Sequence, residues 1–162
     1  MLRMDRPNLE AQRAAMKKLA FLIGNWSGEA SVLRAPGEFV ELSQTEEAQF
    51  KLGGLIIMIE GVGRMKSGGT PVLQALGLIS FNDASGKYHM RAFNDGRWLE
   101  TEVKLVDEPN AITWGFTLGE MRTHSILRVN ERGEWVEHAD LTVSGGPPQK
   151  LIDLTVQRIH AE

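Results

Sequence analysis

Leu19-Ala-Phe-Leu-Ile-Gly-Asn-Trp-Ser-Gly-Glu29 is the stretch in which a helical pattern stops and the first long strand begins. Its apolar run ends at Gly24, and Trp26 and Gly28 follow at once. Glycine permits backbone geometry and close contacts that other residues resist. The sequence therefore predicts a sharp change from helix to strand here, and the rest of the chain has the pattern of strands and turns.

The composition favours one globular domain and excludes several kinds of site. A chain of 162 residues can bury a sizeable core, so we expect a single domain over residues 1–162. The 18 basic and 21 acidic residues give a net charge of −3 and leave no basic stripe, which argues against a nucleic-acid partner. Without cysteine there is no disulfide, thiolate nucleophile or sulfur-ligated metal site.

Neither a secretory signal nor a membrane segment is predicted. The start, Met1-Leu-Arg-Met-Asp-Arg-Pro7, lacks the apolar core of a signal peptide. The longest purely apolar run, residues 55–59, is far too short to span a bilayer. We therefore expect a cytoplasmic protein with no membrane partner.

The N-terminal region predicts one helix over about residues 8–23. Asn8 can cap it, and the residues that follow are good helix formers. Leu9, Met16, Leu19 and Ile23 approximate one apolar stripe. Such a helix must pack against another part of the protein, most simply the end of a barrel.

From Asn25 onward, segments of alternating polarity are separated by turn residues about every ten residues, as in an antiparallel meander. No separator could hold a crossover helix, and closure of the sheet would remove its edges. We therefore predict an all-β fold, an antiparallel up-and-down barrel of about ten strands over residues 25–159. The predicted strands are 25–35, 38–51, 54–66, 72–82, 86–94, 97–107, 111–118, 120–129, 134–144 and 150–159.

The alternation of side chains along the strands predicts which of them enter the barrel. The interior is mostly apolar with a few polar groups, which is typical of a cavity for a small hydrophobic molecule. For strand 86–94 the pattern leaves open whether Tyr88 and Met90 or His89 and Arg91 face inward. The residues expected to bind the ligand are Leu42, Gln44, Glu46, Met90, Trp114, Phe116, Thr123, Ser125 and Glu137.

Residues 23–29, Ile-Gly-Asn-Trp-Ser-Gly-Glu, resemble the G-x-W signature of calycins. Their G-x-W-x-G form is similar to that of nitrobindin and of fatty-acid-binding-like bacterial barrels. The resemblance implies a ten-stranded antiparallel barrel with an internal ligand cavity. It also implies a late-strand arginine as companion of the tryptophan, and Arg158 matches it. We expect Trp26 and Arg158 to stack where the barrel closes. The residues assigned to barrel closure are Gly24, Trp26, Gly28 and Arg158.

Nitrobindin-type members bind haem through a histidine near the start of the last strand. Residues 149–153, Gln-Lys-Leu-Ile-Asp, contain none, and His160 lies beyond the matching place. The chain is therefore more similar to bacterial calycin-like barrels that lack this histidine. We expect no cofactor, with haem held by His89 or His124 as an alternative. None of the histidines has a spacing suited to a metal site, so none is predicted.

Two inward carboxyl groups leave a second function open. Glu46 and Glu137 could act together in acid–base chemistry, because burial raises a carboxyl pKa toward neutrality. The interpretation we favour places each near the mouth of the barrel or paired with Arg158 or a threonine. No nucleophile with an orienting partner is recognisable, so no catalytic residue is assigned. The expected function is non-catalytic binding of a small hydrophobic molecule; the alternative is an isomerase- or hydratase-type enzyme with Glu46 or Glu137 as base.

Two features of strand 54–66 need an explanation. Gly61-Val-Gly63 with Lys66-Ser67-Gly68 lacks the spacing of a phosphate loop, so the glycines predict a bulge or bend in the barrel wall. The run at residues 55–59 is apolar on both faces, which leaves Ile56 and Met58 on the outside. Either the N-terminal helix or a second copy of the chain in a homodimer is expected to cover them.

Overall fold

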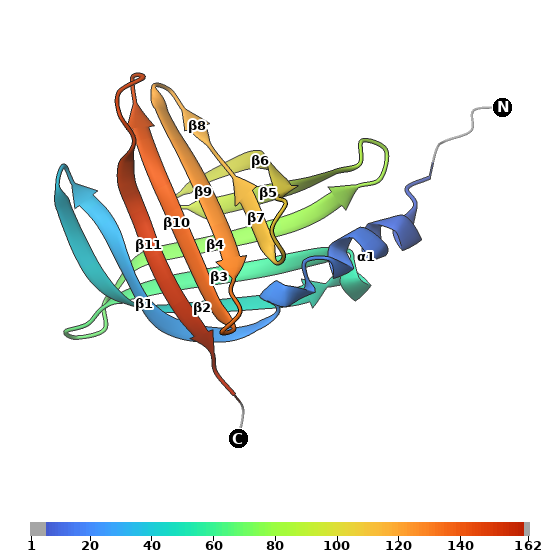
Figure 1. The fold of residues 1–162 in the computed structure, drawn as a ribbon, viewed down its shortest axis with the longest axis horizontal. Coiled ribbons are helices and arrows are strands. Elements are labelled where there is room, and N and C mark those ends of the chain that lie inside the picture. Colours follow the sequence, from blue (N-terminus) through green and yellow to red (C-terminus); the bar gives the residue numbers. More distant parts are fainter. Residues whose placement is uncertain (1–5, 161–162) are drawn as a thin grey trace.

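The strands form one continuous antiparallel sheet that closes on itself in a computed structural model, which describes residues 6–160 (Figure 1). Each strand from β1 to β7 pairs with the next; β7 then pairs with β9, β9 with β10, β10 with β11, and β11 returns to β1. The predicted barrel of ten antiparallel strands is therefore confirmed. The elements are α1 (Leu9–Lys17), β1 (Gly24–Ala35), β2 (Glu38–Lys51), β3 (Ile56–Met65), β4 (Pro71–Asn82), β5 (Lys87–Asn94), β6 (Arg97–Leu105), β7 (Ala111–Trp114), β8 (Thr117–Leu118), β9 (Met121–Val129), β10 (Glu134–Val143) and β11 (Gln149–Arg158).

The strand predicted over residues 111–118 is interrupted. β7 ends at Trp114, and β8 is a two-residue strand that pairs only with the start of β9. Between them, threonine side chains replace ladder hydrogen bonds: Thr101 Oγ1 donates to the carbonyl of Gly115 at 2.6 Å, and the backbone N–H of Phe116 donates to Thr123 Oγ1 at 3.1 Å. The wall thus stays hydrogen-bonded where the strand breaks.

The predicted helix is shorter than residues 8–23. Asn8 caps α1 through Oδ1, which accepts from the N–H of Ala11 at 3.0 Å, but α1 ends at Lys17 and a short 3-10 turn covers residues 20–22. Sequence propensity gives no reason to stop at Lys17. After the helix, the carbonyls of residues 21–23 accept hydrogen bonds from the side chains of Trp26 and Arg158, so tertiary contacts hold this segment in its non-helical course.

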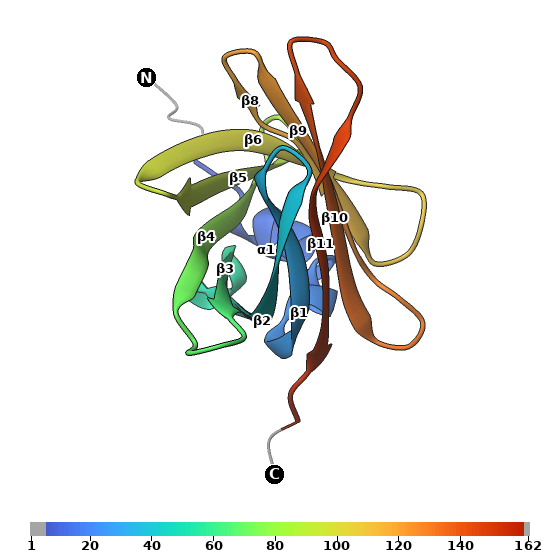
Figure 2. The ribbon, with the colours of Figure 1, turned by 90° about the vertical axis from the view of Figure 1, so that its left-hand side faces the viewer.

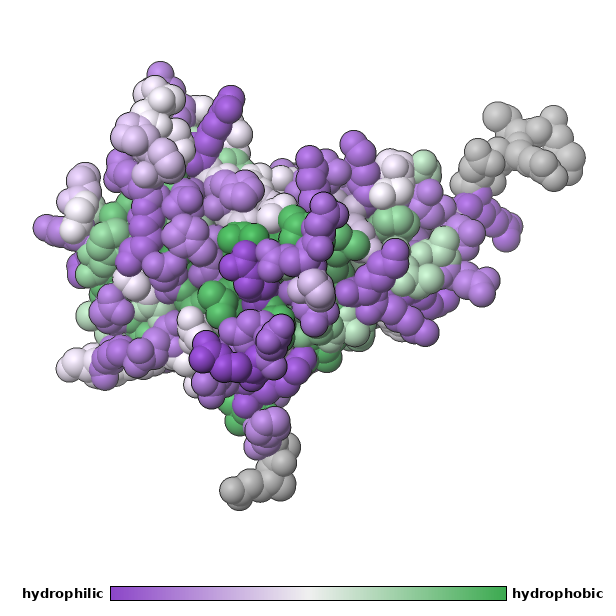
Figure 3. Space-filling view, in the orientation of Figure 1, coloured by the Kyte–Doolittle hydropathy of each residue, from purple (hydrophilic) through white to green (hydrophobic). Residues whose placement is uncertain are grey.

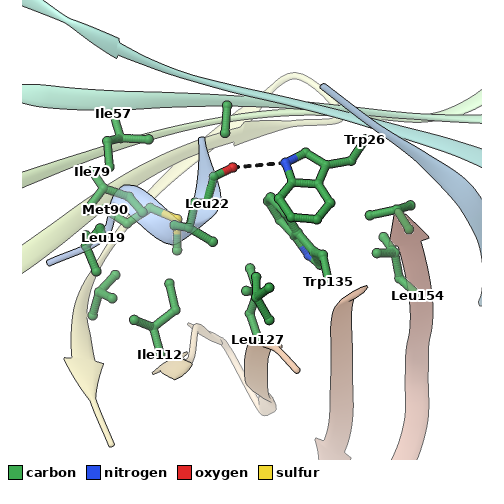
Figure 4. Close-up of a cluster of buried hydrophobic side chains, with 14 of the residues drawn as sticks. Leu19, Leu22, Trp26, Ile57, Ile79, Met90, Ile112, Leu127, Trp135 and Leu154 are labelled. Atoms are coloured by element: carbon green, nitrogen blue, oxygen red, sulfur yellow. Dashed lines mark hydrogen bonds between the residues drawn. The ribbon is translucent and has the colours of Figure 1, made fainter. Parts of the chain in front are cut away.

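The N-terminal segment closes one end of the barrel (Figures 2 and 4). Met16, Leu19 and Leu22 are fully buried and join the core that the inward side chains of the strands form. Polar contacts hold α1 in place: Tyr88 donates its hydroxyl to the carbonyl of Ala15 at 2.7 Å, and Gln12 Nε2 donates to Asp83 at 2.8 Å. The expectation that the helix packs on the barrel end is confirmed.

The outer surface of β3 stays without this cover. The pairing of β3 with its neighbours puts Ile57 and Ile59 inside and leaves half-buried Ile56 and Met58 on the outer face. The apolar side of the N-terminal segment is directed to the interior, so cover of that outer face by a homodimer stays a prediction. On the side of the molecule where β10 and β11 lie in front, the surface is mostly hydrophilic (Figure 3). No helix within residues 6–160 is long and apolar enough to cross a membrane.

Candidate ligand-binding site

The barrel encloses a cavity of about 470 Å³. This volume is within the roughly 300–1,000 Å³ of pockets that hold small molecules. Its wall is mainly aliphatic and aromatic, with side chains from nearly every strand, among them Ile59, Leu73, Ile79, Leu99, Ile112 and Leu127. Exposed residues at and beside the β5–β6 turn, Asn94, Asp95 and Arg97, form part of its mouth.

Eight of the nine side chains predicted to bind a ligand line this cavity. They are Gln44, Glu46, Met90, Trp114, Phe116, Thr123, Ser125 and Glu137. Leu42 is the exception, because it is fully buried in the core without reaching the cavity. Its Cδ1 lies 2.8 Å from where a Cβ would stand on Gly63, so Leu42 fills space that this glycine leaves free.

The structure decides the question left open in strand 86–94. Tyr88 and Met90 are buried and face inward, and Met90 lines the cavity. His89 and Arg91 therefore face outward, where Arg91 pairs with the exposed Glu100 at 2.6 Å. Tyr88 does not reach the cavity; it serves the contact with α1 instead.

The two inward carboxyl groups are not at the mouth and, among residues 6–160, pair neither with Arg158 nor with a threonine, so the interpretation favoured from the sequence is wrong. Glu46 Oε1 accepts from Gln44 Nε2 at 3.0 Å, and Glu137 Oε1 accepts from Trp135 Nε1 at 3.4 Å. Glu46 is only 8 % exposed, and the surface that Glu137 keeps faces the cavity that it lines. Arg158 instead donates to the carbonyls of the N-terminal turn.

Burial gives both carboxyl groups a high affinity for protons. Removal from water raises the pKa of Glu46 to about 8, with a further contribution from the charge of Glu137 and a small opposing one from the Gln44 hydrogen bond. Burial likewise raises the pKa of Glu137 to about 7, against the hydrogen bond from Trp135. Near neutral pH the pair therefore holds protons that exposed glutamates would have lost.

Two glycines of β3 make room for these polar side chains. A Cβ on Gly61 would lie 2.7 Å from Glu46 Oε2, and a Cβ on Gly63 would lie 2.7 Å from Gln44 Oε1. The register of β3 does shift after Gly63, as a bulge would require, but the space above the glycines is a second reason for them. Gly61-Val-Gly63 thus allows Gln44 and Glu46 to point inward from the neighbouring strand.

Trp26 and Arg158 meet where β1 pairs with β11. The guanidinium carbon of Arg158 lies 4.4 Å from the centre of the Trp26 ring, so the expected stacking is present. The fully buried indole donates from Nε1 to the carbonyl of Leu22 at 2.9 Å and packs edge-on against Trp135 (Figure 4). Gly24 has a φ of 141°, which favours glycine, and a Cβ on Gly28 would lie 2.1 Å from the carbonyl oxygen of Thr155.

The mouth residues were absent from the prediction. Arg97 has the parity of Leu99, so extending the alternation of strand 97–107 by one pair would have placed it inside. Asn94 ends β5 with the parity of Met90, so the same extension would have included it, whereas Asp95 belongs to a turn, where the alternation of a strand gives no information. Ala75 and Gly61 are too small to stand out in a hydropathy pattern.

The donor set does not suit haem held by a histidine. His89 and His124 are on the outer face, and His138 contacts Asp140 and Asp153 there at 2.8 Å and 2.5 Å. His160 follows the end of β11. No histidine within residues 6–160 lines the cavity, so the barrel offers no imidazole to iron there.

Comparison with known proteins supports the fold and gives no family. The chain matches no protein-family model and no curated protein sequence. It is similar to the crystal structure of Rv2717c from M. tuberculosis, with a TM-score of 0.68 and 13% identity, over 90% of this chain and 98% of that one. A DUF3598-family protein from Nostoc punctiforme PCC 73102 aligns over 89% of this chain and 98% of that one, with a TM-score of 0.30 and 7% identity.

Proposed function

We propose that this protein binds a small, largely hydrophobic molecule inside its barrel and does so without catalysis. The observation that carries the proposal is the cavity of about 470 Å³ with an apolar wall and a few polar side chains. We also propose that the barrel is calycin-like. The G-x-W-x-G residues and the Trp26–Arg158 contact support this relation.

Native mass spectrometry of gently purified protein tests the binding function, followed by thermal-shift measurements with a panel of lipids and apolar aromatic compounds. We expect either a copurifying molecule or a rise in Tm with members of the panel, because a ligand that binds only the folded state stabilises it. The absence of both would contradict the proposal.

The buried carboxyl pair favours a second candidate, proton transfer within the same cavity. Glu46 and Glu137 have pKa values of about 8 and about 7, near those of an effective general base at neutral pH. A carboxylate among apolar side chains is also a stronger base than one in water. An isomerase- or hydratase-type reaction would use one of them to remove a proton and the other to hold it.

The apolar substrate 5-nitrobenzisoxazole tests this second candidate. Removal of its C–H proton breaks the N–O bond and yields a coloured phenolate, so a single base is sufficient. A saturable rate that rises between about pH 6 and 8, and that disappears in the double variant Glu46→Gln, Glu137→Gln, is expected of an enzyme. A rate equal in wild type and double variant would exclude the pair as a base for this reaction.

A further inference from the structure

Glu46, Glu137 and Gln44 bring acceptor atoms that lack a donor into a cavity that also holds the donor groups of Ser125, Thr123 and Trp114. The single hydrogen bonds to Glu46 and Glu137 both reach Oε1, and Oε2 of each accepts none from residues 6–160. The side-chain carbonyl of Gln44, a residue only 1 % exposed, is also without a donor. A buried acceptor without a donor costs free energy, so a group added here is stabilised by donating hydrogen bonds.

The charges around the cavity also favour a ligand group that donates hydrogen bonds, and they favour one with a positive charge. Its charged lining residues are Glu46, Glu137, Asp95 and Arg97, and the last two lie at the exposed mouth. Within residues 6–160, neither Glu46 nor Glu137 forms an ion pair with a basic side chain. A buried carboxylate without a partner is unfavourable, and a cation beside it removes much of that cost.

We propose that the ligand is a hydrophobic amine, whose ammonium group donates its N–H groups to the free carboxyl oxygens of Glu46 and Glu137 while its apolar part fills the rest of the barrel. This inference rests on the proposed binding function and specifies its ligand class. An ammonium group brings three donors and a positive charge, whereas an alcohol brings one donor and a carboxylate brings further acceptors.

Proton release is expected to accompany amine binding. Between about pH 6 and 8 the pair retains protons, since its pKa values lie at about 7 and about 8. A cation next to the carboxyl groups favours their ionised forms and lowers both pKa values. The protons displaced when the ammonium group enters would then appear in the solvent.

Three probes with the same apolar chain test the head group: octylamine, 1-octanol and octanoate, titrated calorimetrically at about pH 7.5 in buffers of different ionisation enthalpy. We expect octylamine to bind about tenfold or more tightly than 1-octanol, with octanoate weaker than both, because charge-assisted hydrogen bonds are the stronger ones. Only octylamine should release protons. These comparisons use the unaltered protein, so they do not depend on how well a variant folds.

Variants then test whether the preference for octylamine over 1-octanol depends on Glu46 and Glu137. Glu46→Gln with Glu137→Gln should bring octylamine to the affinity of 1-octanol, while Glu47→Gln, which alters the exposed neighbour on β2, should keep the wild-type preference. Octanoate binding as tightly as octylamine, or octylamine and 1-octanol binding equally to wild type, would overturn the inference and leave hydrophobic binding intact. Failure of all three probes to bind would instead contradict the proposed function.

Discussion

Trp26 shows how one side chain joins three parts of the molecule. Its indole is fully buried, its Nε1 donates to the turn before β1, and its ring lies beneath Arg158 of the last strand. Arg158 adds a hydrogen bond of 2.8 Å to the carbonyl of Phe21. The first strand, the last strand and the N-terminal segment thus share one contact.

Replacement of this indole should destabilise the protein. We expect Trp26→Phe to lower the free energy of unfolding by about 1–3 kcal/mol, because the buried carbonyl of Leu22 loses its donor. Denaturation in urea measures the change. Trp98→Phe, on a side chain that is 59 % exposed, is the matched control and should cost less than about 0.5 kcal/mol. Equal losses in the two variants would contradict this role of Trp26.

Gly61 should be intolerant of a methyl group for a reason specific to the site. A Cβ there would lie 2.7 Å from the Glu46 carboxyl group, so Gly61→Ala must displace this buried carboxyl group and its hydrogen bond from Gln44, at a cost of about 1–3 kcal/mol. Gly77→Ala is the control, since its Cβ would meet the flexible Met90 side chain at 3.3 Å. If urea denaturation gave the same stability for both variants, the space over Gly61 would not be needed by Glu46.

At the scale of elements, α1 closes the barrel end through an interface that is partly polar. Gln12 and the backbone N–H of Asn8 both reach Asp83 in the turn after β4, and Tyr88 reaches the carbonyl of Ala15. The apolar residues after α1 then enter the core. The helix is therefore fixed at both ends and is not free to leave the barrel without breaking these bonds.

Removal of the Tyr88 hydroxyl should loosen α1 selectively. Tyr88→Phe keeps the ring in the core but loses the 2.7 Å hydrogen bond to Ala15, a net loss of about 0.5–1.5 kcal/mol. Amide hydrogen exchange should accelerate in residues 9–17 more than in β9–β11, which serve as the internal reference. A uniform acceleration across the protein would show that the hydroxyl does not hold the helix.

The whole molecule combines a closed wall, an apolar cavity and two carboxyl groups that folding removes from water. Unfolded glutamates have a pKa near 4.5, whereas those of Glu46 and Glu137 rise to about 8 and about 7 in the fold. Between about pH 4.5 and pH 8 the folded state therefore binds more protons than the unfolded state. Stability must therefore fall as pH rises through this range.

This pH dependence is measurable by urea denaturation from about pH 5 to 8. The free energy of unfolding should decrease steadily in wild type, and most of the slope should disappear in the double variant Glu46→Gln, Glu137→Gln. His138 contributes in the same direction, because Asp153 raises its pKa, and the double variant leaves that contribution in place. A stability that rises with pH over this range would contradict the burial of the pair.

The strands were predictable because the sequence of each one shows an alternation of polar and apolar residues between turn residues. Period-two alternation placed Gln44, Glu46 and Glu137 inside before any contact was known, and glycine-rich turns gave strand ends within a few residues. What depends on distant parts of the chain was not predictable. The non-helical course of residues 21–23 depends on donors at Trp26 and Arg158, and the break after Trp114 depends on Thr101 and Thr123 from neighbouring strands.

In the candidate site, too, local sequence predicts some features, and contacts between distant parts of the chain decide the others. Parity identified the side chains that face inward, but whether Leu42 reaches the cavity depends on how far it leans over Gly63 from the adjacent strand. The environment of Glu46 and Glu137 was also missed, since their lack of an ion pair with a basic side chain of residues 6–160 is a property of three-dimensional packing. Turn residues such as Asp95 line the mouth of the barrel, and no strand alternation predicts their position.

Fluorescence titration with the neutral apolar dye N-phenyl-1-naphthylamine tests the central claim, that the barrel interior is a binding cavity. The comparison pairs wild type with Ala75→Leu, which adds carbon atoms to the inward wall, and with Gln74→Leu, which adds an apolar side chain on the outer face of the same strand. We predict saturable binding to wild type and Gln74→Leu, weakened about tenfold or more in Ala75→Leu. Absence of binding to wild type, or equal binding to all three proteins, would contradict it.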